Sequence, residues 1–476
     1  MMRLLPALLL APTLAAAAPA AADPAVDRAL ATAPVGTRIG LVVVDETGRE
    51  IVAVRGDERF IPASNTKIFT TAAAFATLDV AAADGGGGAA VRLDGRDIVL
   101  SGHGDARLSS APDCTVDCLA ALARAVAAKT RTVGDVIGDD SVFPDERWPA
   151  GMSWNNQVGR YGTAISALAI DDDVATLTVT ARGTGEAPAI AGDGYYGIEN
   201  AALTVTGGGK PALTATRIPG SDLLRIAGTI PAGAAPETLV VGLDDPAHRA
   251  AWLFAAMLRA DGVRVTGKVV ARHRAPTPAD DPATRGAAPV ARAPAPMALA
   301  TLAPPPLADD LRHTNKVSQN LHAELFLRRV GAVAGSGSVA DGRAAVIALL
   351  DRAGVDRAAY DFADGSGMSS YNRVTPRATV RFLRWIQAQP WGGAWRATLP
   401  VGGIDGTLAR RFKNTPLDGK LFAKTGSLNA ANALSGFLVT AKGRTFTFSA
   451  LANDMPDDAS ATGAVDQALL AIAAAN

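Results

Sequence analysis

Ser64 and Lys67 form the first point in the chain where two side chains could together do covalent chemistry. A serine hydroxyl is a poor nucleophile until a neighbouring base removes its proton. On a helix, residues i and i+3 share a face, and burial can lower the pKa of a lysine enough to make it that base. The Ser-x-x-Lys pattern also occurs by chance in most chains of this size, where an exposed helix face is the ordinary explanation.

Ser318 and Asn320, separated by Gln319, form the second candidate group. The Ser318 hydroxyl could relay a proton to a leaving amine. The Asn320 amide could hold a substrate carbonyl or the head group of the lysine. The alternative is a helix N-cap, because a helix is expected from here to Val330.

The third group is the run Lys424, Thr425, Gly426 and Ser427. Lys424 and Thr425 could bind a substrate carboxylate, and Gly426 would let a substrate backbone approach closely. The backbone amide of Ser427 could pair with that of Ser64 to form an oxyanion hole. The alternative is an ordinary strand with a bulge glycine.

The elements that must position Ser64 are indicated by local patterns near the N-terminus. Two apolar, β-rich runs, 37–44 and 50–55, flank the turn residues Asp45 to Gly48 and predict a hairpin. Pro62 and the alanine-rich stretch to about Leu78 predict a helix. Ser64 is therefore expected at or just inside the helix N-terminus.

The third group lies in a region that predicts an antiparallel sheet. Two β-rich runs, 434–440 and 445–451, follow it and are separated by the turn residues Lys442 and Gly443. A terminal helix is expected after them, and helical periodicity dominates from Leu307 onward. The sequence therefore predicts an α+β domain in which helices flank an antiparallel sheet.

The middle of the chain has a different pattern. After the glycine run 85–88, strand-like segments are expected at 97–101, 175–181, 202–206, 223–230 and 238–241, with helices at 119–128 and 247–260. Nine prolines fall within the 31 residues from Pro276 to Pro306, which indicates a linker or an extended surface crossing. The simplest arrangement is one α+β domain built from both ends, with a large, mostly β, region inserted between them.

Composition limits the classes of partner and the compartment. Lys plus Arg equals Asp plus Glu at 46 each, so nothing suggests a nucleic-acid partner. Nine lysines against 37 arginines make a lysine within a motif notable, because a lysine can lose its proton when buried and an arginine cannot. Residues 1–22 have a basic start, an apolar run and small residues, which predicts a cleaved signal peptide; an uncleaved anchor is the alternative. We expect a secreted or periplasmic protein with no integral membrane span after cleavage.

Cys114 and Cys118 are the two cysteines of the chain. An oxidising compartment permits a disulfide between them, with a pair of buried thiols as the alternative. Two thiols make only half a zinc site, and no histidine stands close enough in sequence to complete one. No metal and no cofactor are therefore expected.

The three groups stand in the order that Ser-x-x-Lys, Ser-x-Asn and Lys-Thr-Gly take in serine β-lactamases and penicillin-binding proteins. The chain resembles the class C low-molecular-mass penicillin-binding proteins, the D-alanyl-D-alanine carboxypeptidase/endopeptidase family. The segments Gly102 to Leu108, Asp364 to Ser369 and Leu399 to Leu408 add to the likeness. The resemblance implies a serine β-lactamase/DD-peptidase-like fold. It also implies a catalytic domain of 23–84 and 298–476, an accessory domain of 85–170 and 242–297, and a nested domain of 171–241.

The resemblance also implies a reaction. Ser64 would attack the carbonyl between two D-alanines of a peptidoglycan stem peptide, Lys67 would take its proton, and Ser318 would protonate the leaving D-Ala. Water would then release the acyl-enzyme. β-Lactam antibiotics would acylate Ser64 as covalent inhibitors, and the same site could cut cross-links as an endopeptidase.

Two departures from the family pattern concern the second motif and the substrate side chain. Gln319 stands where Asp or Asn is common, and we expect its side chain to point away from Ser64. Asn156, in the segment Trp154-Asn155-Asn156, stands where an Asp often helps to bind the diaminopimelate ammonium. A neutral amide binds a cation less well than a carboxylate, so the side-chain preference at the third stem-peptide residue stays open.

Three other functions are alternatives to a D-alanyl-D-alanine peptidase. A β-lactamase shares the motifs but lacks such an insertion and needs an efficient base for deacylation. A Ser-His-Asp hydrolase would need a Gly-x-Ser-x-Gly motif at its nucleophile. The most similar segment, around Ser366, begins with Ala363 and not with a glycine. A peptidoglycan-binding scaffold that had lost activity would not need to keep the residues of the motifs.

Overall fold

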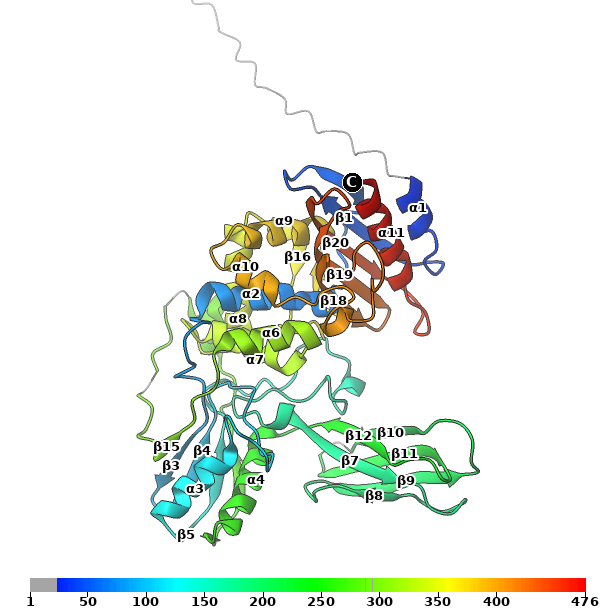
Figure 1. Cartoon of the computed structure of the whole chain (residues 1–476). Helices are drawn as coiled ribbons and strands as arrows, with labels where there is room; N and C mark the ends of the chain where they lie inside the picture. The colour runs from blue at the N-terminus through cyan, green and yellow to red at the C-terminus, as the bar shows by residue number, and fades with distance from the viewer. Residues whose placement is uncertain (1–23, 219, 287, 293) are drawn as a thin grey trace, which may run out of the picture.

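The computed structural model of the chain describes residues 24–218, 220–286, 288–292 and 294–476 (Figure 1). The predicted signal peptide, residues 1–22, lies outside these ranges. Within them, every helix is too short or too polar to cross a lipid bilayer.

A five-stranded antiparallel sheet brings the two ends of the chain together. Its strand order is β18-β19-β20-β1-β2, so β1 lies beside β20 although Arg38 and its partner Asn453 are far apart in sequence. The predicted hairpin and the predicted C-terminal strands are both present, and the structure joins them in one sheet. The strands are β1 (Arg38–Val44), β2 (Glu50–Val54), β18 (Leu421–Leu428), β19 (Ala431–Val439) and β20 (Thr445–Asn453).

Helices cover both faces of this sheet, which confirms the α+β class. On one face α2 (Thr66–Thr77) lies at the centre of the larger apolar core, and ten of its twelve residues are buried. A helix buried on all sides holds its side chains rigidly, which suits a helix that carries Lys67. Its neighbours are α6 (Leu307–Val317), α7 (Asn320–Gly331), α8 (Val339–Arg352), α9 (Pro376–Gln387) and α10 (Gly392–Ala397). On the other face α1 (Pro24–Leu30) packs against α11 (Thr462–Ala475).

The inserted region contains a second five-stranded sheet with two helices, and lies below the first sheet in Figure 1. Its order is β14-β6-β4-β3-β15, and α3 and α4 pack with it around a separate apolar core. β15 pairs with β3, so this sheet extends past the predicted boundary at residue 297. The elements are β3 (Ala90–Asp94), β4 (Asp97–Ser101), β6 (Val136–Asp139), β14 (Val269–Arg272), β15 (Ala300–Thr301), α3 (Leu119–Lys129) and α4 (Pro246–Ala260), with the short pair β5 (Thr132–Val133) and β13 (Arg264–Val265).

Two three-stranded sheets, of orders β12-β7-β8 and β10-β11-β9, are built from residues 174–242 and project to the right in Figure 1. The strands of the second sheet all lie between β8 and β12 in sequence. They share an apolar core of their own. The division into three domains remains a prediction. The strands are β7 (Val174–Thr180), β8 (Ala189–Ala191), β9 (Gly197–Val205), β10 (Ala212–Arg217), β11 (Leu223–Pro231) and β12 (Glu237–Gly242).

Three smaller features complete the chain. The described residues of the proline-rich crossing form only α5 (Pro282–Arg285), a 3₁₀ turn and β15, in keeping with the absence of a long predicted element. β16 (Tyr360–Asp361) and β17 (Arg373–Val374) form a two-residue ladder. Cys114 and Cys118 form a disulfide, and Cys118 is the N-cap of α3. The disulfide that we predicted for this pair is present.

Candidate active site

Ser64 lies in a 3₁₀ turn, Ala63–Asn65, that leads directly into α2. Ala63 has a φ of 47°, in the left-handed region that residues other than glycine rarely adopt. Ser64 is half-buried and Lys67 is fully buried one turn further on. The Lys67 Nζ atom lies 3.0 Å from Ser64 Oγ, so the predicted nucleophile and base are in hydrogen-bond contact.

Lys67 has two further acceptors, and both lie 2.6 Å from its Nζ atom. They are the Oδ1 atom of Asn320 and the backbone carbonyl oxygen of Ser366. Burial lowers the pKa of Lys67 to about 7, although Asp364 and Glu324 act in the opposite direction. A lysine with this pKa is neutral in a large fraction of molecules near neutral pH, as a proton acceptor must be.

The carbonyl of Ser366 is fixed by a buried glutamate on α7. Glu324 Oε1 accepts hydrogen bonds from the backbone N–H groups of Gly365 and Ser366, at 3.0 and 2.8 Å. Its Oε2 atom pairs with Arg328 at 3.2 Å, and both side chains are 2% exposed. The loop that holds Lys67 is therefore anchored to α7 by backbone contacts and by a buried ion pair.

Asp364 holds the same loop, which carries the Ser366 carbonyl, through hydrogen bonds to the loop's own backbone. Its carboxylate accepts from the N–H groups of Gly367 and Ser369 and from the amide of Asn372. Burial, with a contribution from Glu324, raises the pKa of Asp364 to about 6. The sequence segment from Asp364 to Ser369 was notable only as a family likeness, and the structure shows that it forms the wall behind the lysine.

The second motif occupies the junction between two helices. Ser318 ends α6 in the left-handed conformation, with a φ of 64°, and its Oγ atom accepts a hydrogen bond from Lys424 at 2.9 Å. Gln319 turns back to cap α7 by accepting from the N–H of Leu321, and does not line the cleft. Asn320 is buried, and its Nδ2 atom donates to the backbone carbonyl of Tyr161 at 2.8 Å. The inserted region thus contacts the second motif directly.

The third motif lies on β18, an edge strand that runs past Ser64. Lys424 is fully buried, and burial together with the charge of Lys67 lowers its pKa well below the usual lysine range. A Cβ atom on Gly426 would lie 2.7 Å from the carbonyl oxygen of Pro62 and 3.1 Å from the amide nitrogen of Ser64. Only glycine fits this close approach of the strand to the nucleophile.

These residues open into a cleft of about 660 Å³. Four of them, Ser64, Ser318, Asn320 and Thr425, share its lining with Gly426 and Ser427, whereas Lys67 and Lys424 lie behind it. Sequence reasoning placed Asn156 near the substrate, and it does line the cleft. It gave no role to three other lining residues, which are Tyr161, Met368 and Thr407. Met368 and Thr407 lie in segments that the sequence marked only for their likeness to the family, and no local pattern marks Tyr161; each reaches the cleft through tertiary contacts.

The arrangement excludes the Ser-His-Asp alternative. Ser366 is 1% exposed and presents its carbonyl, not its hydroxyl, to Lys67. His322 is bonded to Asp310 and Asp172, and together with Asp172 it borders a different, smaller pocket near Arg107.

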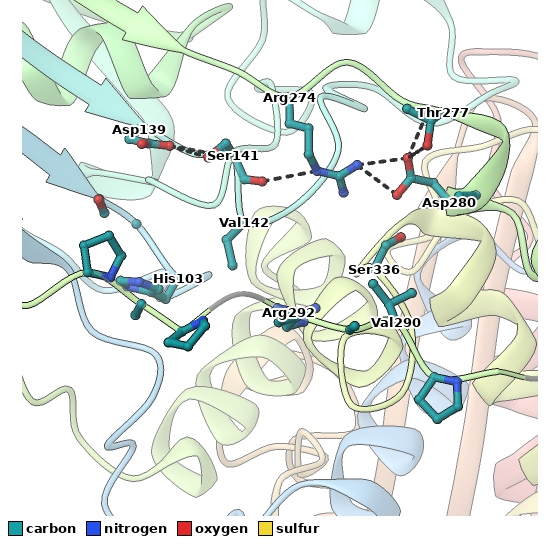
Figure 2. Close-up of a pocket in the computed structure, with 18 of the residues that line it drawn as sticks. His103, Asp139, Ser141, Val142, Arg274, Thr277, Asp280, Val290, Arg292 and Ser336 are labelled. Carbon is teal, nitrogen blue, oxygen red and sulfur yellow. Dashed lines mark hydrogen bonds and ion pairs between the residues drawn. The ribbon is translucent and has the colours of Figure 1, made fainter.

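A larger cavity of about 990 Å³ lies between the second sheet and the proline-rich crossing. Figure 2 shows Arg274 reaching from Ser141 to Asp280, at 3.3 Å from the Ser141 carbonyl and 2.9 Å from both carboxylate oxygens. No residue of the three motifs lines this cavity. The capacity for acyl transfer therefore belongs to the smaller cleft.

A serine bonded to a buried lysine, with a second serine bonded to another lysine on an adjacent edge strand, defines an active-serine enzyme of the penicillin-binding and β-lactamase class. Comparison with known proteins narrows this class. Residues 22–475 match the model of the D-Ala-D-Ala carboxypeptidase 3 (S13) family. The chain belongs to that family.

Three relatives illustrate the likeness. A D-alanyl-D-alanine carboxypeptidase of Actinomadura sp. (strain R39) is 35% identical over 431 residues, which cover 85% of this chain and 75% of that protein. The crystal structure of penicillin binding protein 4 (dacB) from Haemophilus influenzae matches with a TM-score of 0.78 at 22% identity, covering 93% and 97% of the two chains. The same protein complexed with a β-lactam matches with a TM-score of 0.71 at 20% identity, over the same shares. The two structures establish the fold.

Proposed function

We propose that this protein is a serine-type D-Ala-D-Ala carboxypeptidase that acts on peptidoglycan stem peptides through an acyl-enzyme on Ser64. The contact that carries the proposal is the one between Ser64 Oγ and the fully buried Lys67 Nζ, at 3.0 Å. The family match and the activity printed for the Actinomadura relative support the choice of reaction.

The first half of the reaction uses all three motifs. Neutral Lys67 takes the proton of Ser64 as the hydroxyl attacks the carbonyl carbon between the two D-alanines. The backbone amides of Ser64 and Ser427 stabilise the oxyanion that forms. The bond to the leaving D-Ala then breaks, and the proton that Lys67 took from Ser64 reaches the departing amine through the hydroxyl of Ser318, which is bonded to Lys424.

Water completes the cycle by attacking the acyl-enzyme carbonyl: it gives one proton to Lys67, which passes it to Ser64 Oγ as the shortened peptide leaves. Thr425 supplies a hydroxyl in the cleft where the terminal carboxylate of D-Ala would sit, and Lys424 lies directly behind that position. A β-lactam carries a carboxylate and a strained amide and would acylate Ser64 in the same way. The protein would act outside the cytoplasm after removal of residues 1–22.

The neutral Asn156 bears on which wall peptide is preferred. It lines the cleft, and the resemblance to the family implies that an aspartate is common at this position. We propose that recognition of a diaminopimelate ammonium by this residue is weak, and that Asn156→Asp raises kcat/KM about tenfold for a peptide with that ammonium but not for an acetylated analogue. An equal effect on both peptides would contradict this role. Adding a cross-linked peptide to the same assay would separate endopeptidase from carboxypeptidase activity.

Labelling with a fluorescent penicillin tests the proposal directly. The mature protein should be labelled in a stable 1:1 adduct, Ser64→Ala should not be labelled, and the wild type should release free D-Ala from a stem pentapeptide. Rapid turnover of the penicillin would indicate a β-lactamase instead. A folded wild type that neither labels nor releases D-Ala would indicate a binding scaffold.

A further inference from the structure

The gap between the second and third motifs is spanned twice. Inside the site, Lys424 of β18 donates to Ser318 at the end of α6. Closer to the surface, Lys316, in the last turn of α6, pairs with Asp405, and its Nζ atom lies 2.8 and 2.6 Å from the two carboxylate oxygens. The second connection lies two residues before Ser318 and involves a loop that also reaches β18.

That loop, residues 400–407, extends the edge of β18 beside the cleft. Ala423 donates to the carbonyl of Pro400 at 3.0 Å, and Gly402 donates to the carbonyl of Leu421 at 2.8 Å. These bonds cover the outer edge of the strand only as far as Ala423, so the edge beyond it faces the cleft. Asp405 stabilises the turn that follows, because its Oδ1 atom accepts from the N–H of Val401 at 2.9 Å.

Beyond the turn, the loop reaches the third motif. The Oγ1 atoms of Thr407 and Thr425 lie 2.7 Å apart, so the orientation of the Thr425 hydroxyl depends on where the loop holds Thr407. On its other side the loop is packed against α6. Gly406 has a φ of 57°, and a Cβ atom there would lie 2.5 Å from the carbonyl oxygen of Lys316.

We propose that Lys316 and Asp405 are positioning residues that set the distance between Ser318 and Thr425 across the cleft. The Lys316 side chain is 18% exposed and that of Asp405 is 41% exposed, so the ion pair is only partly screened by water. Losing it would release the turn at Asp405, and with it both Thr407 and the last turn of α6. The inference rests on the proposed roles of Ser318 and Thr425.

Removal of either charge should slow acylation. We expect Asp405→Asn and Lys316→Met each to lower the second-order rate of acylation by a penicillin about tenfold, since a displacement of about 1 Å can cost up to about 100-fold in rate. The double variant should be no slower than the slower single variant, because the two residues act as one unit. The reversed pair, Lys316→Asp with Asp405→Lys, should recover part of the rate.

A second ion pair on α6 provides a matched control. Arg312 and Asp309 lie 2.8 Å apart with both side chains more than half exposed, and Asp309→Asn should leave acylation and the melting temperature unchanged. Rates of the Lys316 and Asp405 variants within twofold of this control would overturn the proposal. Losses that multiply in the double variant, or that follow a fall in melting temperature, would do so too.

The outcome for Ser64→Ala keeps this test separate from that of the proposed function. If the wild type is labelled by the penicillin and Ser64→Ala is not, the acyl-enzyme reaction stands whatever Lys316 and Asp405 do. If the wild type is not labelled, the proposed function fails first, and the positioning role fails with it.

Discussion

Replacing Asn320 by aspartate tests whether neutral Lys67 is the base. The substitution is nearly isosteric and puts a carboxylate oxygen where Oδ1 now lies, 2.6 Å from Lys67 Nζ. An opposite charge at this distance favours the protonated lysine and raises its pKa by about 1–3 units. From a starting pKa of about 7, the pKa of Lys67 should move to between about 8 and about 10.

The sign and size of the kinetic effect follow from the neutral fraction of the lysine. In the wild type about half of the Lys67 side chains are neutral at pH 7. In Asn320→Asp that fraction falls to between about one tenth and one thousandth, so acylation at pH 7 should fall about 5- to 500-fold. The loss should shrink as the pH rises through the new pKa, because the base is deprotonated again.

The measurement is the acylation rate with a chromogenic penicillin from about pH 5 to about pH 10, which spans the old and new pKa values. Asn320→Ala is the control, because it removes the hydrogen bond without adding charge and should not move the rise in rate to higher pH. Both variants lose the bond to the Tyr161 carbonyl, and that loss should lower the plateau at every pH. If Asn320→Asp is slower by the same factor throughout, Lys67 is not the titrating base and the reasoning is wrong.

Two further predictions concern groups packed around the site. Gly367→Ala should abolish acylation, because the new Cβ would lie 1.9 Å from the carbonyl oxygen of Ala63 at a φ of 91°. Gly426→Ala, with a nearest contact of 2.7 Å, should leave a measurable acylation rate, and Gly393→Ala, which meets nothing within 4 Å, should match the wild type. Equal acylation rates in all three variants would contradict this account of the packing. Arg328→Met should lower the free energy of unfolding by about 3–5 kcal/mol in urea titrations, because it leaves buried Glu324 without its ion-pair partner, and a loss below about 1 kcal/mol would show that the pair contributes little.

The reactive residues could be predicted because their patterns are local. Ser64 and Lys67 need only the i, i+3 spacing of a helix, and the antiparallel strands around Lys424 follow from β-rich runs and a turn. The order of the three motifs then supplied the function. Gln319 could also be predicted to point away from Ser64, since the middle residue of such a motif lies on the far side of the turn.

The surroundings of these residues could not be predicted in the same way. The carbonyl of Ser366 and the carboxylate of Glu324 act on Lys67 across hundreds of residues of sequence, and only the packed fold brings them together. The two-residue strands β5, β13, β16 and β17 are too short to show any periodicity. β15 escaped detection because its two paired residues are embedded in a proline-rich crossing.

The central sheet also dictates an order of assembly during synthesis. β1 and β2 emerge first, but β1 has to pair with β20, and Arg38 meets Asn453 only when almost the whole chain exists. The inserted sheets draw all their strands from residues 90–301 and can be complete long before that point. Domains generally fold as units as they become available, and contacts so distant in sequence form slowly.

The N-terminal hairpin must therefore wait, with its apolar face uncovered, while the insertion folds beside it. Ser64 and Lys67 lack their partners in the site at this stage, because the end of α6 and β18 are synthesised after the insertion. A chain that stops short of β20 would carry the nucleophile but not the sheet that organises it. We therefore expect the serine of an incomplete chain to be unreactive toward a penicillin until the last strands have joined the sheet.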